Sequence, residues 1–142
     1  MKLKQAVSNI LLLSLVFVTA NAQDEKGEIK KVAAQFVKGA DINDGQLLEE
    51  VLESKSLQYV LIGGKMSTFT AKDYIQMVKD KKLGGKPREI TYRHAEFLGK
   101  SLAVVVLNAV SVEYDFLYQL SMTKLASGKW QIVGITAEIN GV

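Results

Sequence analysis

The spacing of apolar residues predicts two helices in the first part of the chain. In the first, apolar side chains recur at steps of three and four, so they share one stripe of a helix expected from Glu25 to Lys38. The stripe consists of Ile29, Val32, Ala33, Phe36 and Val37. Asp44 can cap a second, shorter helix with the same spacing. Its apolar face consists of Leu47, Leu48, Val51 and Leu52.

Beyond the second helix the apolar pattern changes to alternation, which is typical of strands. Leu57 to Ile62 is predicted as a strand, Gly63-Gly64 as a tight turn and Lys65 to Phe69 as a short return strand. The next residues have the spacing of a helix capping box, so a third helix is predicted from Ala71 to about Lys82. A glycine-rich loop ends it.

Four long antiparallel strands are predicted from Arg88 onward. This part is rich in β-branched and aromatic residues, and turn signals divide it at Gly99-Lys100, at 108–113 and at Ser127-Gly128. Because the helices come first and the strands follow, the pattern indicates an α+β fold. The strand from Leu102 to Ala109 is apolar on both faces, whereas helices can cover only one of them. We therefore expect a homodimer that forms through the sheet.

The N-terminus has the three-part pattern of a cleavable secretory signal peptide, predicted over residues 1–22. A basic start precedes an apolar run from Ile10 to Val18, and Ala20 and Ala22 supply the small residues for cleavage after Ala22. The run is too short to span a bilayer, which needs about 20 apolar residues. We therefore expect one exported domain, residues 23–142, that is periplasmic or secreted and not bound to a membrane.

Charge and cysteine content narrow the classes of partner. The chain has 18 Lys and Arg against 15 Asp and Glu, and loss of two lysines with the signal leaves 16 against 15, a net charge of +1. A nearly neutral surface gives no electrostatic reason to expect nucleic acid as a partner. With no cysteine and one histidine, neither a disulfide nor a metal site is predicted, and no cofactor is expected.

Three segments carry a family resemblance. They are an amphipathic helix that ends near Gly39-Ala40-Asp41, the stretch from Ser67 to Tyr74, and the final stretch from Ser127 to Val133 with its Gly-Lys-Trp. Together they resemble the putative lumazine-binding family of the nuclear transport factor 2-like superfamily. The resemblance implies a cone of three helices packed on a curved antiparallel sheet, with an internal cavity. It also implies that dimers form through the sheet.

Period-two alternation places His94, the single histidine, on one strand face with Tyr92 and Glu96. If this face lines a cavity, the imidazole can move a proton, Glu96 can hold its tautomer and Tyr92 can donate to an oxyanion. The alternative is that the intervening residues face the core, which leaves these three exposed to solvent. Asp115 is a further candidate acid, but it lies beside a predicted turn, where acids are normally solvated.

Aromatic side chains suit a flat ligand. The residues expected to contact it are Tyr59, Tyr92, His94 and Tyr118. Alternation also places an aromatic and apolar stripe on one face of a strand, where packing against helices is the competing use. This stripe consists of Tyr114, Phe116, Tyr118, Leu120 and Met122. One local excess of positive charge suits either an anionic ligand or a solvated helix end. It consists of Lys79, Lys81, Lys82, Lys86 and Arg88.

The sequence leaves three functions open, because the superfamily contains both enzymes and non-catalytic domains. The favoured one is a non-catalytic domain that binds a small apolar or aromatic ligand or a protein partner. The alternative is a small isomerase or dehydratase-like enzyme that uses His94 with Glu96 or Asp115, which requires His94 to point inward. The third is an interaction module whose own side chains fill the cavity. That module would lack a pocket of about 300 Å³.

Overall fold

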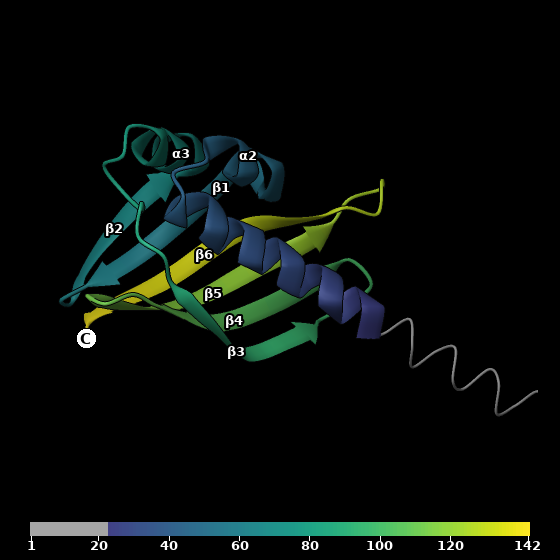
Figure 1. The fold of residues 1–142 in the computed structure, drawn as a ribbon. Coiled ribbons are helices and arrows are strands. Elements are labelled where there is room, and N and C mark those ends of the chain that lie inside the picture. Colours follow the sequence, from purple (N-terminus) through teal and green to yellow (C-terminus); the bar gives the residue numbers. More distant parts are fainter. Residues whose placement is uncertain (1–22) are drawn as a thin grey trace, which may run out of the picture.

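A six-stranded sheet carries helices on one of its faces (Figure 1). The structure, a computed structural model, describes residues 23–142, so the predicted signal peptide lies outside the described residues. The strands are β1 (Leu52–Ile62), β2 (Lys65–Thr70), β3 (Glu89–Phe97), β4 (Leu102–Val110), β5 (Tyr114–Lys124) and β6 (Trp130–Gly141). The helices are the N-terminal helix, described over residues 23–41, α2 (Gly45–Val51) and α3 (Ala71–Lys79).

The predicted α+β fold, three helices on a curved sheet, is confirmed, and the sheet includes one parallel contact. Its strands follow the order β2-β1-β6-β5-β4-β3. The strands β3 to β6 form the predicted antiparallel meander, and β1 pairs antiparallel with β2. β1 also pairs in parallel with β6, because the last strand returns to lie beside the early hairpin. The two β segments thereby form one continuous sheet.

Both short helices begin at their predicted caps. The carboxylate of Asp44 accepts hydrogen bonds of 3.0 and 3.2 Å from backbone N–H groups of α2, and the hydroxyl of Thr70 accepts one of 3.1 Å at the start of α3. These bonds satisfy N–H groups that have no partner within a helix. α3 ends at Lys79 and not near Lys82, because Lys81 has a φ of 58°, in the left-handed region that an α-helix does not use.

The core lies between the N-terminal helix and the sheet, and Figure 1 shows this helix crossing the sheet face. Phe36 on the helix is fully buried and contacts the rings of Tyr74 from α3 and Tyr118 from β5, at centroid distances of 5.9 and 5.4 Å. Large apolar side chains on the inner face of the sheet complete the core. They include Val105, Leu107, Leu120, Met122 and Ile132. Burial of each stabilises the fold by roughly 1.5–3 kcal/mol.

Candidate ligand-binding cavity

A cavity of about 330 Å³ lies on the helix-covered face of the sheet, at the end where the β1–β2 hairpin meets α3. Its floor is formed by β1, β5 and β6, and Phe69 and Tyr74 line one wall. Its mouth is formed by residues of the loop 80–88 and of the β4–β5 turn. Pockets for small ligands typically measure about 300–1,000 Å³, so this cavity has room for a small ring compound.

Strand register brings the floor residues of the cavity together. One row across the sheet consists of Val60, Ala137 and Tyr118. The next row consists of Ile62, Ile139 and Phe116. The predicted aromatic stripe of β5 therefore contributes to the core at one end and to the wall of the cavity at the other. Tyr118 is buried in the core, Phe116 is half-buried, and Tyr114 is exposed at the mouth.

The guanidinium of Arg88 forms part of the cavity wall and is held by an extensive set of contacts. Its Nε donates to Oδ1 of Asp41 at 2.6 Å, its Nη1 to the hydroxyl of Tyr118 at 2.8 Å and its Nη2 to the carbonyl oxygen of Val37 at 3.2 Å. The side chains of Arg88 and Asp41 are only 6% and 11% exposed. Arg88 also lies over the Phe116 ring, 4.7 Å from its centroid. This buried ion pair ties the end of the N-terminal helix to the sheet.

The same surroundings set the charge states of Arg88, Tyr118 and Tyr74 in the cavity wall. Burial by itself lowers the pKa of Arg88, but its interactions with Tyr118 and with the carboxylate of Asp41 raise it by more, so the guanidinium stays protonated. Burial raises the pKa of Tyr118 and of Tyr74 above the usual range for a phenol. Both phenols are therefore neutral near pH 7. The inner part of the cavity carries one cation, which its own carboxylate partner neutralises.

The loop at the mouth is held against the end of the N-terminal helix. The backbone N–H of Gly85 donates to the carbonyl oxygen of Ala40 at 2.9 Å, and Asn43 Nδ2 donates to that of Leu83 at 2.8 Å. Gly84 has a φ of 75°, and a Cβ there would lie 2.0 Å from the Ala40 oxygen. Only glycine fits this approach, so the rim is positioned before any ligand arrives.

The predicted basic cluster does not form a single anion site. Lys79 pairs with Glu49 of α2, and Lys86 pairs with Glu113 across the mouth at 2.6 Å. Arg88, the last member, is buried with Asp41, as described above. These three members therefore point to separate partners.

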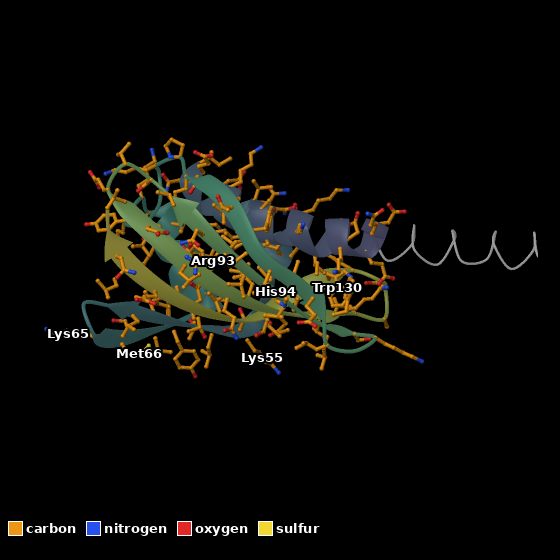
Figure 2. The ribbon with its side chains drawn as sticks, turned by 90° about the horizontal axis from the view of Figure 1, so that it is seen from below. Lys55, Lys65, Met66, Arg93, His94 and Trp130 are labelled. Carbon is orange, nitrogen blue, oxygen red and sulfur yellow. The ribbon has the colours of Figure 1, made fainter. Side chains whose placement is uncertain are left out.

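A bulge in β3 overturns the predicted alternation on that strand. Tyr92 is in register with Leu107 and His94 with Val106, so Arg93 is an extra residue between them. The bulge puts Tyr92 on the inner face and His94 on the outer face. The prediction that these two residues share a face is therefore wrong, because an inserted residue reverses the side-chain alternation. Figure 2 shows His94 and Arg93 on β3, with Lys55 and Met66 on the β1–β2 hairpin.

The candidate catalytic residues lie away from the cavity. His94 Nε2 and Glu96 Oε2 are 2.8 Å apart, and both side chains are more than half exposed, at 55% and 56%. Asp115 accepts a 2.6 Å hydrogen bond from Asn108 Nδ2 on the same outer face. Register places it two strands across the sheet and four residues along it from His94, roughly 16 Å away. The inward imidazole that the enzyme alternative requires is absent from this arrangement.

The four residues predicted to contact a ligand divide between the two faces of the sheet. Tyr118 lines the cavity. Tyr92 is on the same face but donates its hydroxyl to the carbonyl oxygen of Lys30 at 2.9 Å, which ties β3 to the N-terminal helix. Tyr59 lies on the outer face, in register with Thr136 of β6. His94 shares that outer face, so the structure does not bring these four side chains to one site.

Sequence reasoning missed several residues that line the cavity. In the sequence, Phe69 and Tyr74 flank the start of the third helix, where they are expected to pack over its cap, Tyr74 also offers aromatic surface for a flat ligand, and no role is predicted for Gln58. A signal for Gln58 was present, because alternation on β1 places it on the same face as Val60, where a polar side chain is unexpected. Contacts of Phe69 and Tyr74 depend on how α3 packs, which local patterns do not specify.

The sequence matches the model of the family described as Putative lumazine-binding over residues 24–136. The chain belongs to this family. No protein of curated function matches the sequence. The match covers every element that forms the cavity except the last residues of β6.

Solved structures show the same fold at low sequence identity. An NTF2-like protein of unknown function from Silicibacter pomeroyi DSS-3 has a TM-score of 0.74 and 14% identity, with 84% of this chain and 98% of that chain covered. One from Methylobacillus flagellatus KT has a TM-score of 0.69 and 18% identity over 82% and 93%. A ketosteroid isomerase-like protein from Erwinia carotovora atroseptica SCRI1043 has a TM-score of 0.66 and 11% identity over 81% and 95%. The domain is therefore NTF2-like in fold.

Over residues 23–142, no group of three or more His, Cys, Asp or Glu side chains is placed to hold a metal ion. No helix in the same range is both long enough and apolar enough to cross a membrane.

Asp41→Asn is expected to lower the free energy of unfolding by about 3–5 kcal/mol, because it leaves the buried Arg88 cation without its counter-charge. Adding Arg88→Met should recover much of this loss, since the double variant buries no unpaired charge. Urea unfolding measures both. Glu28→Gln, in the exposed Lys31 pair, is the matched control and should change stability by about 0.5 kcal/mol or less. A double variant no more stable than Asp41→Asn would contradict the ion-pair account.

Proposed function

We propose that this NTF2-like domain binds a small apolar or aromatic molecule in the cavity and does not transform it chemically. The observation that carries the proposal is a preformed, largely apolar cavity of about 330 Å³ with an aromatic stripe along its floor. Such a stripe offers wide contact area to a flat molecule at little cost in side-chain entropy. The size of the cavity argues against the alternative of an interaction module filled by its own side chains.

The polar groups of the cavity support binding without catalysis. Among the described residues that line it, Glu113 is the one carboxylate, and it lies at the mouth in a pair with Lys86. Arg88 is held by Asp41 and Tyr118, and no imidazole lines the cavity. General acid–base chemistry needs a group that can gain or lose a proton within reach of the substrate. The inner cavity offers no carboxylate or imidazole for this purpose.

The family supports a flat heterocycle as the class of ligand. Its description names lumazine, a bicyclic compound that is planar and small enough for a cavity of this volume. The fold shared with the ketosteroid isomerase-like protein does not favour catalysis, because folds of this kind support many functions and the identity is 11%. Lumazine is therefore the first compound to test.

A thermal-shift experiment with lumazine tests binding and its location together. At 100 times its dissociation constant, a ligand that binds only the folded protein stabilises it by about 2.7 kcal/mol, so the melting temperature should rise. Ala137→Leu, which places a larger side chain in the cavity floor, should abolish the rise. Thr136→Leu is the matched control, because the neighbouring residue faces the other side of the sheet. An equal rise in the wild type and Ala137→Leu would contradict binding in the cavity.

We also propose that the protein is exported and binds its ligand outside the cytoplasm. The N-terminal pattern of a basic start, an apolar run and small residues at the cleavage position supports removal of residues 1–22. The mature chain would then begin at Gln23, in the periplasm or outside the cell. N-terminal sequencing of the chain recovered from cells checks this, and an intact Met1 on the mature protein would contradict it.

Association through the outer face of the sheet is proposed as well. The helices leave this face uncovered, and several large apolar side chains are exposed or half-exposed on it. They include Leu57, Tyr59, Leu61, Met66, Leu102 and Val106. A homodimer would remove them from water. Sedimentation should show a dimer that Val106→Asp converts to monomer, and a wild-type protein that sediments only as monomer would contradict this.

A further inference from the structure

Gln58 is a polar residue in the middle of the apolar floor of the cavity. It lies on the inner face of β1, between Phe69 of β2 and Ile135 of β6 in the register of the sheet. The residue is only 2% exposed, and its amide nitrogen Nε2 has no hydrogen-bond partner among the described residues. It also lines the cavity. A donor is therefore buried, unpaired and next to a space large enough for a small molecule.

An unpaired buried donor is unfavourable for the protein on its own. Leaving a buried polar group without a partner costs about 1–3 kcal/mol, whereas an apolar side chain of the same shape would avoid this cost. In native proteins, the few such groups call for an explanation. The nitrogen Nε2 itself is out of reach of water in the structure, so the side-chain amide must rotate to turn Nε2 toward the cavity before an acceptor on a ligand can bond to it. The amide thus favours ligands that carry an acceptor.

Two other polar groups near the floor are already engaged. The hydroxyl of Tyr118 accepts from Arg88 Nη1, and the guanidinium of Arg88 also donates to Asp41 and Val37. Val60 and Phe69, which flank Gln58 on its own face, are apolar, and the third neighbour, Ser56, does not line the cavity. Gln58 is therefore one of the groups in the inner cavity, together with the hydroxyl of Tyr74, that can select a ligand by hydrogen bonding.

We infer that the ligand is a planar aromatic compound with a hydrogen-bond acceptor, such as a ring carbonyl, that receives a hydrogen bond from Gln58 Nε2. This inference rests on the proposed function, since it assigns chemistry to the molecule in the same cavity. The ring contacts Phe69 and Phe116 while its carbonyl points to the strand β1. Gln58 is a specificity-determining residue that separates carbonyl compounds from hydrocarbons of the same shape.

Two matched probes, 1-indanone and indane, test this because they differ by one carbonyl oxygen. Isothermal titration of the wild type should show 1-indanone binding about 5- to 10-fold more tightly than indane, the effect of one neutral hydrogen bond. Gln58→Met keeps the length of the side chain and removes the amide. It should bind the two probes with equal affinity and retain its affinity for indane. Without ligand, its melting temperature should equal or exceed that of the wild type.

Ser56→Ala is the control variant, because Ser56 lies on the same strand and face. Its hydroxyl is also buried without a partner, but it is not among the residues that line the cavity. This variant should keep the wild-type preference for 1-indanone. Gln58→Leu provides a second apolar replacement if Gln58→Met does not fold.

The outcomes separate this inference from the proposed function. If the wild type binds both probes equally and Gln58→Met changes neither affinity, the role of Gln58 is overturned while binding in the cavity stands. If neither probe binds the wild type, the proposed function fails and the inference fails with it. If Ser56→Ala loses the preference as completely as Gln58→Met, the effect comes from the strand and not from the amide, which also overturns the inference.

Discussion

The buried ion pair between Arg88 and Asp41 joins the parts of the molecule that form the cavity. Asp41 ends the N-terminal helix, Arg88 leads into β3, and the guanidinium reaches Tyr118 in the middle of β5. A buried pair contributes little net stability over an apolar replacement, but breaking it is costly, so it fixes the position of each partner. The apolar core provides the stability of the fold. The ion pair places helix, loop and sheet so that a space remains between them.

That space has two kinds of boundary. The floor comes from strand register, which aligns Val60, Ala137 and Tyr118 in one row, and is as rigid as the sheet. The rim comes from a loop whose Gly84 packs against the end of the N-terminal helix. Both boundaries are set by the protein itself, so a ligand meets a preformed pocket and little ordering free energy is lost on binding. The charged pair of Lys86 and Glu113 is exposed at the mouth, whereas the floor is apolar.

Much of the fold follows from the sequence, and the limits have identifiable causes. Period and capping predicted the N-terminal helix, the hairpin and the four-strand meander, and the family resemblance predicted the cavity. A single bulged residue, Arg93, then reversed the face of His94, and an inserted residue leaves no signal in an alternating pattern. The ion pair of Asp41 with Arg88 joins positions 47 residues apart, which no local pattern can show. The sequence does carry a signal for Gln58, because it is a polar residue on a face of β1 that is otherwise expected to be apolar.

The central claim is that ligands bind on the inner face of the sheet, and an NMR titration of the labelled protein with lumazine tests it most directly. The account predicts that amide signals of floor residues such as Gln58, Phe116 and Tyr118 shift on binding. Signals of His94 and Glu96, on the part of β3 that does not line the cavity, should stay in place. Shifts confined to the outer face, or no shifts at all, would contradict the account.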